Sequence, residues 1–284
     1  MIRLLAVDID GTLLNSRGQL PDTHRDALVD AAAAGVEVAL VTGRTFHFAR
    51  PVAQLLPIPL TLIVNNGALV KRTDGTTEIR NLLSRDIARR VLAGTQAYED
   101  SVALVFDPDP LPGGNVERQI VFERMDWSHP DRRGYYEKNK AFIASVPSAL
   151  ADALTEDPVQ VMFNGGVGPM RALVETLTSM PESDRFCVSI TEYERRDFSL
   201  VDVNAQDCSK GTTLGRLAAN RGWTRDTVMA VGDNLNDVAM LDFAGTAVVM
   251  GNATDALKAR GYEVTRSNDE GGLADAVRKH VRQI

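Results

Sequence analysis

The sequence has few cysteines, few aromatic residues and no excess of positive charge. Two cysteines, Cys187 and Cys208, occur among 284 residues, and aromatic residues make up 6%. Two cysteines without a metal-like spacing predict reduced thiols, not a disulfide framework or a zinc site. The formal net charge of −7 argues against a general nucleic-acid-binding protein, which would carry a basic face. Any anion site must therefore be local, built from a metal ion, a few cations and backbone N–H groups.

Long apolar runs are also missing. A membrane span needs about 20 consecutive apolar residues, and no segment reaches that length. The apolar stretch at residues 1–14 carries Asp8 and Asp10 in its middle, and it has no cleavage region of a secretory signal. We therefore expect a cytoplasmic protein with neither a membrane nor a nucleic acid as its partner, acting as a monomer or a small homo-oligomer.

The first third of the chain alternates between apolar runs and helical stretches. Residues 2–7, 36–41 and 60–64 are continuous apolar runs, which is typical of strands buried on both faces of a parallel sheet. Residues 23–34 and 46–56 have helical composition. Strands that alternate with helices through short connections predict a doubly wound α/β sheet.

The same alternation of strands and helices returns near the C-terminus, whereas the middle of the chain has a different pattern. The C-terminal part predicts helices at residues 210–220, 237–243 and 274–281, and strands at 227–231 and 247–250. The middle predicts strands at residues 101–106, 119–123, 159–163 and 186–193, and helices at 86–99, 138–144 and 169–179. We therefore expect an α/β fold whose mostly parallel sheet is formed by residues 1–83 and 205–284, with an α+β domain inserted at residues 84–204.

Two acidic residues, Asp8 and Asp10, stand where the first predicted strand ends. Because strand side chains alternate, both carboxylates are expected to point the same way. Neighbouring carboxylates repel each other, and a divalent cation offsets that cost; Mg²⁺ is the usual ion for oxygen ligands. One carboxylate can attack phosphorus, and the other can give a proton to the leaving oxygen. The alternative is a polar turn in which the acids only cap the backbone.

Two further motifs are weak by themselves. Thr42 and Gly43 follow the second predicted strand, where a hydroxyl and a glycine N–H suit a phosphate oxygen, but the same pair also suits an ordinary strand-to-helix turn. The neighbouring Arg44 can reach a substrate or only brace this loop. Lys210 begins a predicted helix, and its charge adds to a helix end that favours anions. A solvated surface lysine is the alternative there.

A fourth motif, residues 232–237, comes directly after a predicted buried strand. Asp233 and Asn234 offer the oxygen ligands that Mg²⁺ takes, and Asn236 can donate its amide to a phosphate oxygen. A calcium loop does not fit, because its third position is Leu235 and its sixth is not glycine. Asp237 can be part of the site or can only cap the next helix.

All four motifs follow strands of one predicted sheet, at the carboxyl ends where open α/β sheets bind ligands. One cleft would then hold a nucleophile, an acid, a metal ion, a hydroxyl and a lysine. Phosphoryl transfer needs these parts, since it depends on in-line positioning and on charge neutralisation.

These motifs resemble the haloacid dehalogenase superfamily, and more narrowly the Cof-type phosphatases with a large inserted cap of the C2 type (C2B). The resemblance rests on residues 8–12, 42–44, 210 and 232–237, and residues 65–68, 250–253 and 264–271 are also similar to that subgroup's pattern. The inserted middle resembles the subgroup only in length and position.

The resemblance implies a role for each motif residue. Asp8 would be the nucleophile and a Mg²⁺ ligand, and Asp10 would be the general acid/base and bind the metal ion through its backbone carbonyl. The remaining residues divide between the phosphoryl group, held by Thr42, Gly43, Lys210 and Asn236, and the metal ion, held by Asp233 and Asn234.

These roles imply a Mg²⁺-dependent phosphatase that hydrolyses a small phosphorylated metabolite, such as a sugar phosphate, through an aspartyl-phosphate intermediate. A phosphomutase of the same superfamily is an alternative, and so is a trehalose-, sucrose- or mannosylglycerate-type phosphatase. A non-catalytic phosphate sensor would have lost a catalytic acid, and both acids are present here. Candidates for substrate contact in the inserted domain, each of which can equally be an ordinary solvated or packing residue, are Arg118, Arg124, Trp127, His129 and Arg132.

Overall fold

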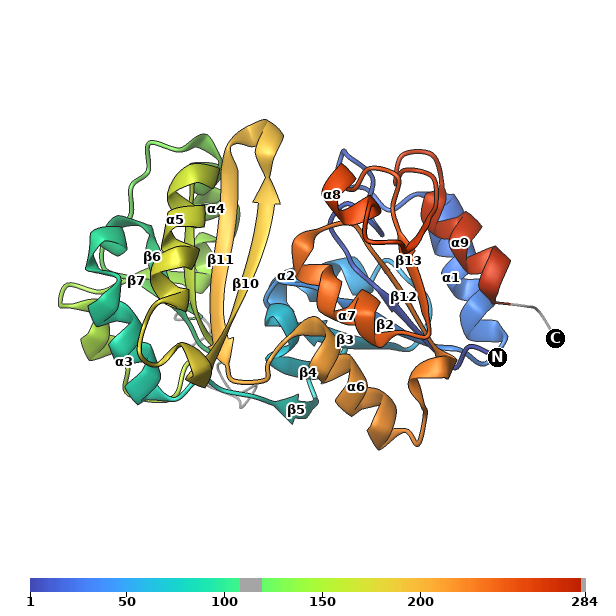
Figure 1. Cartoon of the computed structure of the whole chain (residues 1–284), viewed down its shortest axis with the longest axis horizontal. Helices are drawn as coiled ribbons and strands as arrows, with labels where there is room; N and C mark the ends of the chain where they lie inside the picture. Colours follow the sequence, from blue (N-terminus) through green and yellow to red (C-terminus); the bar gives the residue numbers. More distant parts are fainter. Residues whose placement is uncertain (108–118, 282–284) are drawn as a thin grey trace. The chain divides into compact units, whose positions relative to one another are not determined.

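The computed structural model describes residues 1–107 and 119–281. The chain divides into two compact units: a core unit, Met1–Arg80 with Ser209–Ile284, and an inserted unit, Asn81–Cys208. Each unit has a sheet of its own (Figure 1). The divisions lie a few residues from the boundaries at 83/84 and 204/205 that we expect from the sequence.

The core unit contains an eight-stranded sheet in the order β14-β13-β12-β1-β2-β3-β4-β5. The six strands from β14 to β3 run parallel to one another. Strand β4 pairs antiparallel with β3, and β5 pairs antiparallel with β4. This arrangement confirms the predicted parallel-rich α/β fold. The strands are β1 Leu4–Val7, β2 Glu37–Val41, β3 Leu60–Val64, β4 Leu69–Arg72, β5 Thr77–Arg80, β12 Val228–Gly232, β13 Thr246–Val249 and β14 Glu263–Val264.

Helices cover the core sheet. Figure 1 shows α6 and α7 to one side of strands β12 and β13, and α1 and α9 to the other. Because β1, β2, β3 and β12 are parallel, their carboxyl ends and the loops that follow them meet at one edge of the sheet. The helices are α1 Asp22–Ala33, α2 Phe46–Ala53, α6 Lys210–Asn220, α7 Val238–Phe243, α8 Asp255–Lys258 and α9 Gly272–His280.

The inserted unit has a six-stranded sheet in the order β10-β11-β9-β6-β7-β8, antiparallel except for the parallel pair β7–β8. Apolar side chains of this sheet pack with α3 and α5 into one core. The α+β character predicted for the middle of the chain is therefore confirmed. The elements are β6 Val102–Val105, β7 Ile120–Phe122, β8 Ile143–Ser145, β9 Gln160–Gly165, β10 Phe186–Tyr193, β11 Phe198–Ala205, α3 Arg85–Gly94, α4 Pro130–Asn139 and α5 Val167–Thr178.

The helix predicted at residues 138–144 is confirmed only in part: residues 138–139 end α4 and Lys140–Phe142 form a 3₁₀ helix, but residues 143–144 belong to a strand. Helix α4 begins earlier, at Pro130, and ends at Asn139; Ile143–Ser145 then form β8. Lysine and alanine favour a helix in this segment, but Ile143 pairs with Ile120 of β7, and such a tertiary contact outweighs propensity. Across residues 1–107 and 119–281, every helix is too short or too polar to span a membrane.

A buried histidine joins α1 to the loop after β1. The His24 side chain is 0% exposed, and its Nδ1 lies 2.9 Å from the carbonyl oxygen of Leu13. Its Nε2 is buried without a hydrogen-bond partner. Burial lowers the pKa of His24, because the charged imidazolium would be poorly solvated there.

We expect His24 to make the protein less stable in mild acid. An unfolded histidine has a pKa of about 6.5. Below that pH the histidine of the unfolded chain binds a proton, whereas folded His24 stays neutral. The free energy of unfolding therefore falls as the pH drops. Changing His24→Asn keeps a donor for Leu13 and is expected to reduce this slope by up to about 1.4 kcal/mol per pH unit.

Urea unfolding between about pH 5 and pH 7 measures this slope. Leu28→Ala is the matched control, since it destabilises the same helix without removing a titrating group, and it should keep the wild-type slope. An unchanged slope in His24→Asn would show that other groups cause the acid sensitivity.

Candidate active site

A buried lysine holds two carboxylates together where β1, α6 and the loop after β12 meet. The Lys210 ammonium donates to Asp8 Oδ1 at 2.7 Å and to Asp237 Oδ1 at 2.5 Å. Lys210 is 1% exposed, Asp8 5% and Asp237 0%. The alternative of a solvated surface lysine is therefore wrong, and Lys210 faces the carboxylate at the end of the first strand.

Local structure fixes the position of Lys210 at the first turn of α6. Ser209 is the N-cap residue, and it exchanges hydrogen bonds with Thr212 in a capping box. Gly211 lets α6 approach α7 closely, because a Cβ there would lie 2.1 Å from the carbonyl oxygen of Ala239. The long Lys210 side chain is thus anchored at its base as well as at its charged end.

The loop after β12 is organised by Asp237. Its Oδ2 accepts hydrogen bonds from the backbone N–H groups of Asp233 and Asn234, at 2.9 and 3.0 Å. The Asn234 side chain accepts from the backbone N–H of Leu235 at 2.8 Å, so it caps the short turn Leu235–Asp237. Asp237 therefore closes the turn and also pairs with Lys210, which combines the two alternatives left open by the sequence.

Burial and like charges raise the pKa values of two carboxyl groups here, Asp8 and Asp233. The pKa of Asp8 rises to about 7, first because burial disfavours its anion and then because Asp237 and Asp10 repel it, against the opposing pull of Lys210. The pKa of Asp233 lies well above its usual value, because of burial and of repulsion from Asp8 and Asp237. Burial alone would lower the pKa of Lys210, but Asp237 and Asp8 raise it above its usual value.

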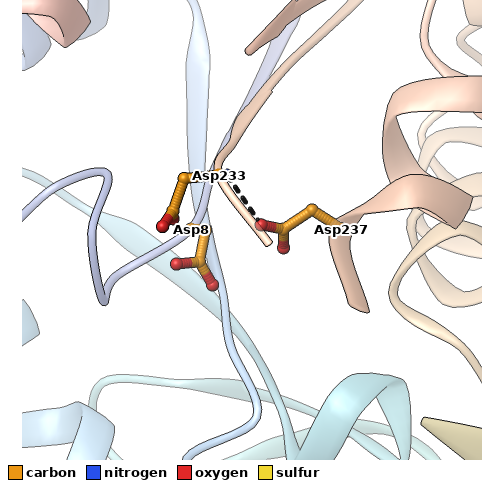
Figure 2. Close-up of side chains that lie close together, drawn as sticks. All are labelled: Asp8, Asp233 and Asp237. Atoms are coloured by element: carbon orange, nitrogen blue, oxygen red, sulfur yellow. Dashed lines mark hydrogen bonds between the residues drawn. The ribbon is translucent and has the colours of Figure 1, made fainter. Parts of the chain in front are cut away.

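The three carboxylates fit a divalent cation. Asp8, Asp233 and Asp237 each offer an oxygen within 4.8 Å of the others, and Figure 2 shows their side chains gathered in one place. Three carboxylates and one ammonium give a formal charge of −3 + 1 = −2, which a divalent cation balances. Both oxygens of Asp237 accept hydrogen bonds of 3.0 Å or shorter. Lys210 bonds to one oxygen of Asp8, and Asp233 Oδ2 has a longer contact, of 3.5 Å, with Asn252. Asp8 and Asp233 are therefore the better candidates for direct ligands.

Residues of the loop after β1 place the Asp233 carboxylate. Thr12 Oγ1 donates to Asp233 Oδ1 at 2.9 Å, and Asn252 Nδ2 lies 3.5 Å from Oδ2. Gly11 has a φ of +85°, and a Cβ there would lie 2.2 Å from Asp233 Oδ2. Position 11 thus requires glycine both for its backbone conformation and for the space that Asp233 occupies.

The second acid of the first motif, Asp10, has a different partner from Asp8. Arg44 donates from Nε to Asp10 Oδ2 at 2.8 Å and from Nη2 to Oδ1 at 2.6 Å, a bidentate pair. Arg44 Nη1 also donates to the Phe48 carbonyl at 3.3 Å. The Asp10 side chain is 38% exposed, so a partly solvated acid stands beside a buried one.

The residues expected to hold phosphate lie in tight turns. Thr42 is 1% exposed, and its Oγ1 accepts from the Arg44 backbone N–H at 3.1 Å. Asn236 Nδ2 donates to Asn66 Oδ1 at 3.0 Å. A Cβ on Gly43 would lie 3.2 Å from the Asn66 amide. Gly43 and Asn236, which are far apart in sequence, therefore share one neighbour.

Several candidates for substrate contact in the inserted unit are engaged in its packing. Arg132 is 6% exposed and donates from Nε to Asn164 Oδ1 at 2.5 Å. His129 accepts from the Asp131 backbone N–H as the N-cap of α4. Trp127 packs edge-on against Phe122, and Arg124 pairs with Glu99. Arg118 lies outside the described residues.

Sequence reasoning missed two asparagines of the core unit. Asn66 contacts both Gly43 and Asn236. Asn252 Nδ2 donates to the Gly11 carbonyl at 2.9 Å, beside its longer contact with Asp233. Both belong to the segments 65–68 and 250–253 that resemble the Cof-type pattern, so the available signal was their position directly after predicted strands.

Comparison with known proteins identifies the family. The haloacid dehalogenase-like hydrolase family matches residues 5–277. The chain is 28% identical to the 5-amino-6-(5-phospho-D-ribitylamino)uracil phosphatase YcsE of Bacillus subtilis over 99% of this chain and 96% of that protein. It is 26% identical to the pyridoxal phosphate phosphatase YbhA of Escherichia coli, over 98% of each chain.

A solved structure shares the whole fold. A haloacid dehalogenase-like hydrolase from Bacillus subtilis superposes with a TM-score of 0.80 at 23% identity, covering 99% of this chain and 100% of that one. The family match at residues 5–277 extends over both units, so the resemblance stated from the motifs is confirmed. The protein is an enzyme of the haloacid dehalogenase-like hydrolase family.

Proposed function

We propose that this protein is a Mg²⁺-dependent phosphatase that hydrolyses small phosphorylated metabolites through a phosphorylated Asp8. The observation that carries the proposal is the buried Asp8 carboxylate, paired with Lys210 and gathered with Asp233 and Asp237 at the carboxyl end of a parallel sheet. A carboxylate held in this way is a candidate nucleophile. Its surroundings also provide the charge neutralisation that phosphoryl transfer needs.

In the first step, a carboxylate oxygen of Asp8 attacks phosphorus while the bond from phosphorus to the ester oxygen breaks. Asp10 gives a proton to the departing oxygen, so the product leaves as a neutral alcohol. Arg44 donates to both oxygens of Asp10 here, which favours the carboxylate, so Asp10 acts as the acid after this contact opens. Lys210 fixes the rotation of Asp8 and offsets part of the negative charge of the incoming phosphoryl group.

In the second step, Asp10 takes a proton from a water molecule as that water attacks phosphorus. The bond between Asp8 and phosphorus breaks, and inorganic phosphate and the free carboxylate result. Thr42, Gly43, Lys210 and Asn236 are proposed to hold the phosphoryl oxygens during both steps, with a hydroxyl, a backbone N–H, an ammonium and an amide as donors.

Asp8 and Asp233 are proposed to hold Mg²⁺, with Asp10 contributing its backbone carbonyl. A bound cation supplies Lewis-acid polarisation of a phosphoryl oxygen and neutralises developing charge. The closeness of the three buried carboxylates supports this assignment, because a cation offsets their mutual repulsion. Asn234 supports the site through its turn, since its side-chain oxygen is engaged in capping.

The substrate class that we propose is a small phosphorylated metabolite, such as a sugar phosphate. Two relatives, which the chain matches over nearly their full length, are named as phosphatases of two phosphorylated metabolites that differ in structure. We further propose that the inserted unit recognises the leaving group and that the enzyme works in the cytoplasm, for which the thiols of Cys187 and Cys208 are suited.

The nucleophile assignment predicts that Asp8→Asn loses turnover of p-nitrophenyl phosphate by at least about a thousandfold, because a carboxamide is a poor nucleophile. The variant should unfold at the wild-type temperature or above it, since it removes one charge from a repulsive cluster. Colorimetric assay and thermal melting measure the two effects. Asp255→Asn, on an exposed side chain, is the control. Near-normal turnover in Asp8→Asn would disprove the assignment.

The metal assignment predicts that EDTA abolishes activity and that Mg²⁺ restores it. Binding to the folded state should also raise the free energy of unfolding, by about 2.7 kcal/mol at a Mg²⁺ concentration one hundred times the dissociation constant. Asp233→Asn should weaken both effects. Measuring activity and melting temperature across a Mg²⁺ titration gives two independent readings. Full activity in EDTA, or an equal response in Asp233→Asn, would contradict the site.

A further inference from the structure

The turn after β3 has an unusual backbone. Asn65, Asn66 and Gly67 all have positive φ angles, of 51°, 54° and 107°. Asparagine adopts this region more readily than most residues, but two in succession before a glycine is a strained arrangement. Asn65 is 1% exposed and Asn66 is 0% exposed, so the turn is held inside the core unit.

The backbone of this turn holds the loop after β2. The Asn65 N–H donates to the Arg44 carbonyl at 2.9 Å, and the Asn66 N–H donates to the Thr42 carbonyl at 3.0 Å. These bonds bracket Gly43, whose N–H is proposed to meet a phosphoryl oxygen.

The Asn66 side chain contacts two of the groups proposed to hold phosphate. Its Oδ1 accepts from Asn236 Nδ2 at 3.0 Å. A primary amide nitrogen has two N–H bonds in one plane, so using one on Asn66 fixes the direction of the other. The same Asn66 amide lies against Gly43, where an added Cβ would come within 3.2 Å of both Nδ2 and Oδ1.

The third residue of the turn meets the helix that carries Lys210. Thr213 Oγ1 of α6 donates to the Gly67 carbonyl at 2.7 Å. A Cβ on Gly67 would lie 2.3 Å from the carbonyl oxygen of Ser209, the N-cap residue next to Lys210. One strained turn thus touches the Thr42–Gly43 loop, Asn236 and the start of α6.

We propose that Asn66 is a positioning residue for phosphate binding. From one buried, left-handed turn it sets the direction of the Asn236 amide and the position of the Gly43 backbone. The inference rests on the proposed phosphatase function. This role explains why the turn keeps a strained backbone, because the positive φ at Asn66 brings its side chain between Asn236 and Gly43.

A matched pair of variants separates positioning from folding. Asn66→Gly and Asn66→Ala remove the same side-chain contacts, but glycine tolerates a positive φ and alanine does not. We expect both variants to raise the inhibition constant of inorganic phosphate and to lower kcat/KM for p-nitrophenyl phosphate by about five- to tenfold, the size of one hydrogen bond. Asn66→Ala should melt several degrees below Asn66→Gly.

A double-mutant cycle tests the route. In an Asn236→Ala background, Asn66→Gly should weaken phosphate inhibition by much less than it does in the wild type, because the amide that it directs is gone. Full additivity would overturn the inference. So would a wild-type inhibition constant in Asn66→Gly, provided that the wild-type enzyme hydrolyses the ester. A wild-type enzyme without Mg²⁺-dependent turnover would instead refute the proposed function itself.

Discussion

The contact of Lys210 with Asp8 and Asp237 is the interaction on which the site depends. An ammonium that is 1% exposed is tolerated only with counter-charges at hydrogen-bond distance, and here it has two. The three residues come from the end of β1, the start of α6 and the turn after β12. Removing Lys210 would leave the buried carboxylates of Asp8 and Asp237 without their counter-charge. The same contact therefore holds three separate segments of the chain together and aligns the proposed nucleophile.

This cluster is more negative than a core designed for stability alone would be. Lys210 balances one of the carboxylates, and burial and repulsion raise the pKa of Asp8 and of Asp233. Natural proteins keep such unfavourable arrangements where function requires them. A divalent cation converts the repulsion into attraction. Gly11 leaves space for the Asp233 side chain, and Thr12 orients its carboxylate through a hydrogen bond. The excess charge is thus an argument for a cation site that local geometry also supports.

The parts that could be predicted from the sequence are those with strong local signals. Strand β3 and helix α6 follow the predicted bounds, because an apolar run and a capped helix are each specified by adjacent residues. The antiparallel strands β4 and β5 were not predicted, since their pairing depends on β3. Asp237 was ambiguous for the same reason: besides closing its own turn it pairs with Lys210, which is distant in the sequence. The position of Asn66 could not be predicted from the sequence. Asparagine can adopt either a negative or a positive φ, and here its spatial neighbours require the positive one.

The proposed assignment of phosphoryl transfer to the core unit and of substrate recognition to the inserted unit affects how the substrate can change. All the residues proposed for phosphoryl transfer belong to the core unit, where buried contacts fix them to one another. In the inserted unit, Arg132 bonds to Asn164 and His129 caps α4, so neither is available as a recognition group without a cost in folding. If the inserted unit recognises the leaving group, as proposed, that selection depends on side chains that the unit does not need for its own stability. Such side chains can be exchanged without disturbing Asp8 or Lys210, and the proposed phosphoryl chemistry can therefore persist while the substrate changes.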